Sequence, residues 1–444
     1  LDNDGDQDLY LSTMGGDRFY VLMNQLNPAD DANPGTLSFT EEAETRGIDL
    51  GGMGTTWGMS LSLGDYDLDG WLDIHTTEWH TYHDAIGLEE NHARLLRNLG
   101  ASNPAHFEDR TVQAGVGMIN YSPLYKNWQL YSLASSFSDL DQDGWPDLIV
   151  TGDYYTSRLF WNKKDGTFSN GTSLAGINGA SAAMGSAIGD LDGDGLLDWF
   201  VSSLYDVDEN YFDSKVGNRL YRNKGDRSFK DITNQHTDVH IGYWGWGTTF
   251  GDFDNDGDLD LVLTNGQDTS LDNSEEFEDF YLTDPMRYWE NIEGVLTPRE
   301  AEVGLTDTGD GKGLLTFDYD NDGDLDIFIT RTAGPPLLYR NDGDSHGDFL
   351  RLKLRGTASN RDALGARVEL LEKQDGPTQV RELRGGSNFL SQNEAVIHFG
   401  MAKSEGAGAI HEIRIHWPRP GGAPSTQILQ GVARNSILEI IEAP

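Results

Sequence analysis

The chain has 444 residues, of which 32 are Lys or Arg and 74 are Asp or Glu, so its formal net charge is −42. This excess of acid argues against binding to nucleic acids or to an anionic membrane surface, because both require a basic surface on the protein. No apolar run approaches the ~20 residues of a membrane-spanning helix. The chain contains no cysteine, which excludes disulfides, thiolate metal ligands and cysteine nucleophiles.

The acidic charge is concentrated in the first three quarters of the chain. Residues 347–444 contain 12 basic and 11 acidic residues, whereas residues 1–346 contain 20 basic and 63 acidic ones. This break in composition predicts two domains, residues 1–346 and residues 347–444.

One acidic motif, Asp-x-Asp-x-Asp-Gly-x-x-Asp, recurs through the first domain. A copy that lacks the first Asp opens the chain at Leu1, and five complete copies follow at Asp65–Asp73, Asp139–Asp147, Asp190–Asp198, Asp252–Asp260 and Asp318–Asp326. The complete copies start 74, 51, 62 and 66 residues apart. A period near 60 residues indicates one supersecondary unit per repeat.

Segments typical of β-strands surround each complete copy. A short apolar run precedes it, at Trp57–Leu63, Tyr131–Phe137, Met184–Ile188, Trp246–Phe250 and Leu314–Phe317. A β-type run follows it, then a signature such as LLRN at Leu95–Asn98, and then a Phe-led segment such as Phe168–Thr172. Each repeat therefore predicts a strand, an acidic loop and three further strands, with little helical periodicity.

Four short antiparallel strands repeated at this period are typical of a β-propeller blade. The repeats resemble FG-GAP/VCBS repeats, the calcium-loop blades also found in integrin-type propellers. The resemblance covers residues 1–346 and implies an all-β fold that usually closes with seven blades, of which six are visible. The chain starts within a motif, and no fourth strand follows Asn341. We therefore expect at least one further strand upstream of this sequence.

The repeated motif has the composition of a calcium-binding loop. Ca²⁺ takes six to eight oxygen ligands, which Asp at positions 1, 3, 5 and 9 and the carbonyl at position 7 would supply, while Gly at position 6 permits the turn. An EF-hand would have Glu at position 12, where this chain has Thr76, Val150, Val201, Leu263 or Ile329. One copy alone would equally be typical of an acidic solvated turn, but five copies in register favour calcium.

Calcium ions at five to six sites are the only cofactors that the sequence predicts. The predicted ligands, loop by loop, are Asp2, Asp4, Asp6 and Asp8; Asp65, Asp67, Asp69, Trp71 and Asp73; Asp139, Asp141, Asp143, Trp145 and Asp147; Asp190, Asp192, Asp194, Leu196 and Asp198; Asp252, Asp254, Asp256, Asp258 and Asp260; and Asp318, Asp320, Asp322, Asp324 and Asp326. Extracellular calcium modules bind with Kd of roughly 10⁻⁴–10⁻³ M. Such sites fill only near millimolar calcium, so the sequence predicts a secreted or cell-surface protein.

The second domain shows the alternating pattern of a small β-sandwich, for example at Leu350–Leu354 and Ile413–Trp417. It resembles the ASPIC/UnbV domain in the stretches Gly356–Leu370, Arg381–Met401 and Ile413–Gly422. This resemblance implies no established chemistry. Its polar residues would form either a binding surface or turns and buried structural contacts; they are Ser359, Asn360, Arg361, Arg384, Ser387 and Gln392.

Several other groups of residues have both a functional and a structural interpretation. A cluster in the second repeat would form a transition-metal site or, more simply, a solvated loop; it comprises His75, Glu78, His80, His83 and His92. Aromatic residues near the innermost strands would stack on a sugar ring or pack between blades; they are Trp57, Tyr131, Trp244 and Trp246. The long insertions Glu78–Asn91, Tyr205–Gly217 and Gln267–Asp284 make the face opposite the calcium loops the default ligand face.

The leading functional hypothesis is a non-enzymatic, extracellular, calcium-dependent propeller for adhesion, matrix or surface assembly, with protein or glycan ligands. Contacts between the basic strands of the tail and the acidic propeller of another copy would build an oligomer or filament. The alternatives are a carbohydrate-binding propeller and a polysaccharide-active enzyme. The sequence offers no convincing acid/base pair for catalysis, and the fold alone does not decide between these functions.

Overall fold

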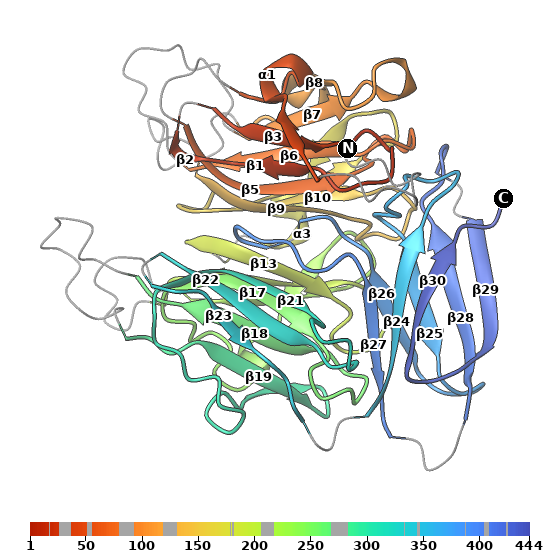
Figure 1. The fold of residues 1–444 in the computed structure, drawn as a ribbon. Helices are drawn as coiled ribbons and strands as arrows, with labels where there is room; N and C mark the ends of the chain where they lie inside the picture. The colour runs from red at the N-terminus through yellow and green to blue at the C-terminus, as the bar shows by residue number, and fades with distance from the viewer. Residues whose placement is uncertain are drawn as a thin grey trace, which may run out of the picture.

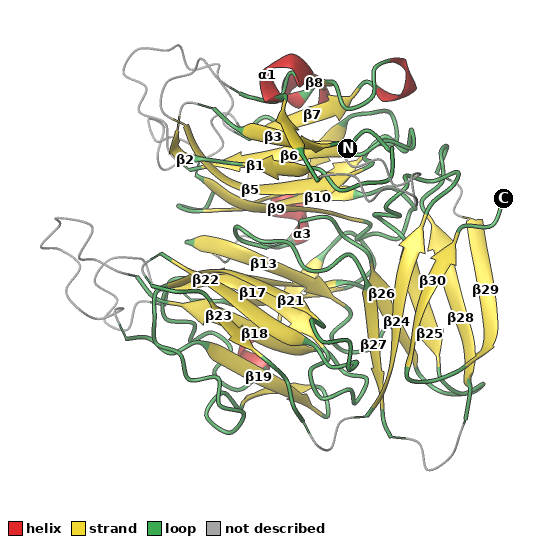
Figure 2. Cartoon of the chain, in the orientation of Figure 1, coloured by secondary structure: helices red, strands yellow, loops and turns green. Residues whose placement is uncertain are grey.

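The computed structural model describes residues 1–16, 18–25, 37–50, 56–79, 93–118, 131–177, 179, 182–205, 217–267, 283–332, 334–343, 347–386, 388–403, 408–422 and 425–444. Strands dominate the fold, and the helices consist of single short turns (Figure 2). Six sheets of three to five strands come first in the chain, and two further sheets at the C-terminal end lie against one side of them (Figure 1).

The six sheets are antiparallel, and each follows the chain order of its strands, as the repeat pattern predicts for propeller blades. Their strands, sheet by sheet, are β1 (Leu9–Leu11), β3 (Tyr20–Asn24) and β4 (Phe39–Glu41); β2 (Met14–Gly16), β5 (Thr56–Gly64), β6 (Asp73–Glu78), β7 (Arg94–Asn98) and β8 (Phe107–Asp109); β9 (Ser132–Ser138), β10 (Asp147–Gly152), β11 (Arg158–Asn162) and β12 (Phe168–Asn170); β13 (Ala183–Gly189), β14 (Asp198–Ser203), β15 (Arg219–Asn223) and β16 (Phe229–Asp231); β17 (Gly245–Gly251), β18 (Asp260–Asn265), β19 (Arg287–Ile292) and β20 (Val295–Pro298); and β21 (Gly311–Phe317), β22 (Asp326–Arg331) and β23 (Leu337–Tyr339).

The Phe-led strands end earlier than the sequence predicts. They stop at Asp109, Asn170 and Asp231, and a helical turn follows each of them. These turns are α2 (Thr111–Ala114), α3 (Thr172–Ala175) and η2 (Thr233–Gln235), and the first blade ends in the same way with α1 (Ala43–Arg46). Glycines with positive φ, at Gly47, Gly115 and Gly176, end the three α-helical turns. A single turn is too short to show helical periodicity, which is why sequence reasoning missed it.

The hydrophobic core of the propeller lies between successive blades. Strands β5, β9, β13, β17 and β21 are the innermost strands, and each packs against the next in that order. One buried cluster joins Tyr66 and Leu95 of one blade to Phe137 and Phe160 of the next. Comparable clusters join each later pair of blades. Since a single sheet cannot bury both of its faces, this stacking supplies the core.

The two C-terminal sheets confirm the strands that alternation predicts. They contain β24 (Asp348–Arg355), β27 (Ile397–Met401) and β30 (Ser436–Ile441) in one sheet, and β25 (Arg367–Leu371), β26 (Thr378–Glu382), β28 (Ile410–Trp417) and β29 (Ser425–Val432) in the other. Leu350, Val368, Phe399 and Trp417 belong to one buried cluster between the sheets. Among the described residues, no helix is long and apolar enough to cross a membrane.

Candidate metal centres

Each complete Asp motif forms the loop between the innermost strand of a blade and the strand that follows it. The Gly at position 6 has a positive φ in every copy, for example +92° at Gly70 and +107° at Gly257. Glycine is favoured at this position because other residues adopt this conformation only with strain. All five loops therefore share one conformation and lie on the same face of the propeller, called the loop face here.

Three carboxylates of each loop converge, with one oxygen from each lying within 4.8 Å of the others. The groups are Asp65, Asp67 and Asp73; Asp139, Asp141 and Asp147; Asp190, Asp192 and Asp194; Asp252, Asp254 and Asp256; and Asp318, Asp320 and Asp326. Backbone amides hold the first carboxylate in place. Asp65, for instance, accepts hydrogen bonds from the amides of Asp69 and Gly70, both at 2.9 Å.

The electrostatics of these loops favour a bound cation. Burial, reinforced by the neighbouring carboxylates, raises the pKa of Asp139 to about 7, and burial raises that of Asp198 to about 8. The Oδ1 atoms of Asp67 and Asp190 are buried without a hydrogen-bond partner in the described structure. A divalent cation would remove both penalties, since it favours ionised carboxylates and provides a partner for their oxygens. The donor set consists of hard oxygens and fits Ca²⁺.

The remaining predicted ligands are arranged differently. Asp2, Asp4, Asp6 and Asp8 are not among the converging groups found in the described part of the chain. At position 7, the backbone amide donates to the position-5 carboxylate at 2.9–3.1 Å in every complete loop, with donors Trp71, Trp145, Leu196, Asp258 and Asp324. The ligand role of the position-7 carbonyls stays a prediction.

The Asn of the repeat signature ties each loop to its neighbour, a role that sequence reasoning missed. In the fourth blade, the amide of Asn223 donates to Asp198 at 2.8 Å. Its side-chain Nδ2 donates to the carbonyl of Leu197 in its own loop at 3.2 Å and to that of Leu140 in the preceding blade at 2.8 Å. Asn98, Asn162, Asn291 and Asn341 repeat this arrangement. The recurrence of this Asn in the repeats was the available signal, although its separation from the last Asp of the loop varies between 15 and 31 residues.

The C-terminal sheets cover the loop face with basic and amide groups. The Arg351 guanidinium donates to Asp318 at 2.9 Å, and only 3% and 0% of the two side chains are exposed. The amide of Gly400 donates to Asp252 at 3.0 Å, and His398 bonds to Asn255 of the same loop at 2.8 Å. The sequence hypothesis placed tail-to-propeller contacts between copies, whereas the structure makes them within one chain.

Comparison with known families agrees with this two-part organisation. The FG-GAP-like repeat family matches residues 139–201 and 207–263, and the family described as ASPIC and UnbV matches residues 356–444. The chain combines FG-GAP-like repeats with an ASPIC/UnbV domain. This confirms the resemblance stated from the sequence motifs.

Curated relatives share the same stretch of sequence. Cartilage acidic protein 1 of Homo sapiens is 28% identical over 316 residues, which is 70% of this chain and 42% of the human protein. The Mus musculus protein is 26% identical over 316 residues, 70% of this chain and 44% of its own length. The chain thus spans less than half the length of these relatives.

Two solved rhamnogalacturonan lyases also show some likeness in fold. YesW has a TM-score of 0.36 at 14% identity, covering 100% of this chain and 71% of its own. The Bacillus licheniformis enzyme has a TM-score of 0.34 at 12% identity, covering 99% of this chain and 74% of its own. Scores this low do not bear on function.

The ASPIC/UnbV domain sends one segment into the centre of the FG-GAP propeller (Figure 1). This segment, Leu383–Glu394, is called the axial segment. Asn388 accepts from the amide of Thr248 in β17 at 2.8 Å and donates to the carbonyl of Leu314 in β21 at 2.6 Å. Arg384 donates to the carbonyl of Ile188 in β13 at 2.5 Å. The axial segment thus occupies the space that the innermost strands surround.

The axial segment also links the first and last of these innermost strands. The amide of Leu390 donates to Ser60 in β5 at 2.9 Å, and the hydroxyl of Ser391 donates to the carbonyl of Leu314 in β21 at 2.7 Å. A glycine pair permits this close approach. A Cβ added at Gly386, whose φ is +71°, would lie 2.2 Å from the carbonyl oxygen of Leu61. In the sequence, Gly385 and Gly386 indicate a turn here, but not that it enters the other domain.

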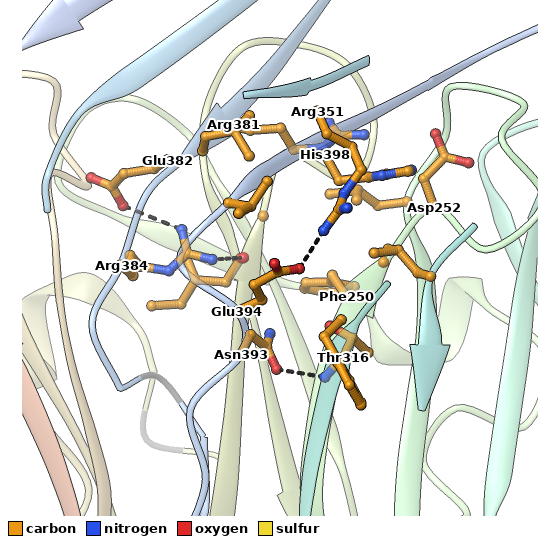
Figure 3. Close-up of a pocket in the computed structure, with 18 of the residues that line it drawn as sticks. Phe250, Asp252, Thr316, Arg351, Arg381, Glu382, Arg384, Asn393, Glu394 and His398 are labelled. Carbon is orange, nitrogen blue, oxygen red and sulfur yellow. Dashed lines mark hydrogen bonds and ion pairs between the residues drawn. The ribbon is translucent and has the colours of Figure 1, made fainter. Parts of the chain in front are cut away.

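A cavity of about 120 Å³ lies where the axial segment enters the propeller (Figure 3). Charged residues from both domains surround it. In Figure 3 the Arg351 side chain points to Glu394, and Arg384 points to Glu382. The carboxylate of Glu382 also accepts from Ser138 of β9 at 2.5 Å. The interface between the domains is therefore polar and ionic as well as closely packed.

The face opposite the loops is rich in aromatic side chains, and is called the aromatic face here. The rings of Trp79 and Tyr131 lie 5.4 Å apart, and those of Tyr131 and Tyr154 lie 4.9 Å apart. Trp244 and Trp246 are nearly parallel, with ring centroids 6.2 Å apart. All five are partly exposed. They sit at the start of innermost strands or directly after the second strands, so the topology places them at the same face.

Other sequence hypotheses are corrected or fall outside the description. His75 and Glu78 lie within β6 rather than in a loop after it, and His75 is fully buried, which lowers its pKa to about 3. They belong to no converging metal group among the described residues. His80, His83, His92, Ser387, most of the three long insertions and the side chain of Trp57 lie outside the described residues.

The polar set of the ASPIC/UnbV domain makes structural contacts. Asn360 is fully buried and bonds twice to the backbone of Leu364, at 2.9 Å each time. Ser359 donates to Glu442 through its amide and hydroxyl. Arg361 donates to the carbonyl of Asn3, and Gln392 lies in the axial segment. These contacts favour the structural interpretation of the set.

Proposed function

We propose that this protein is an extracellular, calcium-stabilised propeller that acts as a non-enzymatic binding module for matrix or surface ligands. The five converging carboxylate groups carry this proposal. Metal ligation is the chemistry for which the described residues are best arranged. Calcium bound at five loops on one face would stabilise the folded state of the whole propeller.

The location outside the cytoplasm follows from the type of calcium site. Loops of this kind with Kd near 10⁻⁴–10⁻³ M fill only where calcium is abundant. The relatives are named for cartilage and for their acidity, and this chain carries a net charge of −42. Both observations support a matrix or surface setting.

Calcium titration tests the proposal. Chelator-stripped protein, titrated with CaCl₂ in a calorimeter, should bind about five equivalents with a Kd at or below about 1 mM. A variant with Asp252→Asn and Asp254→Asn should lose one equivalent, while Asp165→Asn, on an exposed hairpin, should lose none. Binding of less than one equivalent by the unmodified protein would contradict the proposal.

A further inference from the structure

Arginine side chains contact the carboxylates of three calcium loops. In the second blade, Arg97 donates from Nε to Asp67 at 2.5 Å and from Nη2 to Asp69 at 2.7 Å. Two other arginines pair with the same motif positions, 3 and 5, of their loops: Arg222 lies 2.5 Å from Asp192 and 3.2 Å from Asp194, and Arg227 lies 2.5 Å from Asp141 and 3.3 Å from Asp143. Three loops therefore hold a positive charge beside the same two carboxylates.

These positive charges come from two different places in the chain. Arg97 and Arg222 occupy the third position of the repeat signature, which reads LLRN or LYRN. In the third blade this position is Trp161, and Arg227 reaches the loop from the hairpin between β15 and β16 of the next blade. Its guanidinium carbon lies 5.4 Å from the ring centroid of Trp161. Because two unrelated positions supply the same contact, the charge of the loop, rather than packing within the signature, accounts for the arginine.

The arginine leaves one carboxylate oxygen free for a metal ion. Arg97 bonds to the Oδ2 atom of Asp67, whereas the Oδ1 atom of Asp67 is buried without a hydrogen-bond partner in the described structure. Asp67 also belongs to the converging group with Asp65 and Asp73. One carboxylate can therefore bind an arginine and a calcium ion at the same time, through different oxygens.

Two cations that share carboxylates oppose each other. In an empty loop, the arginine offsets the repulsion between neighbouring carboxylates and so stabilises the calcium-free form. In a filled loop, the guanidinium and the divalent ion repel each other. The Arg97 side chain is 28% exposed, so water and salt screen this repulsion only in part. Coupling between two sites is reciprocal, and the arginine therefore weakens calcium binding as much as calcium weakens the arginine contact.

An ordering effect of the arginine would act in the opposite direction, but the backbone already orders these loops. Asp65 accepts from the amides of Asp69 and Gly70, both at 2.9 Å, and Asp69 accepts from the amide of Trp71 at 3.0 Å. These bonds hold positions 1 and 5 of the motif without the arginine. The effect of its charge should therefore exceed its effect on loop order.

We propose that Arg97, Arg222 and Arg227 are built-in counter-ions that stabilise the empty calcium loops and lower their affinity for calcium. The three arginines thereby raise the calcium concentration at which their loops fill, towards the range found outside cells. This inference deepens the proposed function, because it assigns residues that regulate the calcium loops, and it rests on that function.

Calorimetric titration of the chelator-stripped full chain with CaCl₂ tests this role. The variant with Arg97→Met, Arg222→Met and Arg227→Met should bind about three of its equivalents with a Kd that is lowered about tenfold. Lys at the same three positions keeps the charge and should leave Kd within about threefold of that of the unmodified chain. The matched control removes the same charge from arginines that pair with glutamates outside the loops, with Arg18→Met, Arg110→Met and Arg299→Met. It should change Kd by less than about twofold.

Melting temperatures of the same samples provide a second readout. The loss of Arg97, Arg222 and Arg227 should lower the melting temperature in excess chelator more than in millimolar calcium, because calcium replaces the missing charge. A merely structural role would lower both equally and would weaken calcium binding. If the triple variant does not fold in chelator, Arg97→Met alone replaces it and should tighten about one equivalent.

A Kd that is unchanged or raised by the loss of the three arginines would overturn the inference, as would an equal decrease in the control variant. The number of equivalents separates this failure from failure of the proposed function. About five equivalents bound with an unchanged Kd would contradict only the role of the arginines. Less than one equivalent bound by the unmodified chain would contradict the calcium-stabilised fold itself.

Discussion

The two faces of the propeller differ in the side chains that they carry. On the loop face, carboxylates are concentrated in partly buried groups of three, and the ASPIC/UnbV domain contacts two of these loops with Arg351, His398 and the amide of Gly400. On the aromatic face, partly exposed rings pack against one another. The loop face therefore depends on counter-charges for its stability, whereas the aromatic face depends on packing between its rings and the core.

Removal of calcium from the loop face should have the largest effect on the stability of the protein. At free calcium about tenfold above Kd, each site adds about 1.4 kcal/mol, so five sites add about 7 kcal/mol to the free energy of unfolding. Excess chelator at pH 7.5 should therefore lower the melting temperature by about 10 °C in scanning calorimetry. An unchanged melting temperature in chelator would show that the loops are acidic turns without a structural cation.

Removal of calcium should make the melting temperature fall as the pH rises. Burial raises the folded-state pKa of Asp139 and Asp252 to about 7 and that of Asp198 to about 8, above their usual value of 3.8. Their contribution to stability is then present at pH 4 and is lost as the pH rises towards 8. In chelator the melting temperature should fall over this range, and with calcium it should not. A rise with pH in chelator would contradict this account.

Loss of the buried arginine on the loop face should have the next largest effect. Arg351→Met leaves the carboxylates of Asp318 and Glu394 without their counter-charge. Removing one partner of a buried ion pair costs about 3–5 kcal/mol. Urea unfolding in chelator should show this loss, because bound calcium would itself neutralise Asp318, and Lys353→Met, at an exposed position on the same strand, should change stability by less than about 0.5 kcal/mol. Equal effects of the two substitutions would argue against the docking contact.

Substitution of a signature Asn should give the smallest of these effects. Asn223→Ala removes side-chain hydrogen bonds to Leu140, Leu197 and the amide of Gly225. We expect a loss of about 2 kcal/mol in urea unfolding, because each buried bond contributes about 0.5–1.5 kcal/mol. Asn234→Ala, at an exposed position, serves as the control. A loss below about 0.5 kcal/mol would mean that Asn223 does not join the loops.

The repeated part of the fold could be predicted because each blade contains the same local signals. The Asp motif locates a strand end and a strand start, so the predicted innermost strands Tyr131–Phe137 and Trp246–Phe250 lie within one residue of β9 and β17. The convergence of the carboxylates follows from the same spacing. Local rules were sufficient here because the residues that determine each loop are neighbours in sequence.

The axial segment could not be predicted in the same way. Its hydrogen-bond partners, such as Ser60 and Thr248, lie more than 100 residues away in sequence. Nothing in the alternation of the C-terminal strands shows which loop enters another domain. The sequence singled out Trp246, but not its contacts with Phe389 and Lys312, which reach it from other parts of the chain.

A crystal structure determined in millimolar calcium tests the central claim most directly. The account predicts anomalous density for calcium in all five complete loops, with Asp oxygens at 2.3–2.6 Å. It also predicts the axial segment in place among the innermost strands. Loops that contain only water or Arg and Lys side chains in these crystals would contradict it.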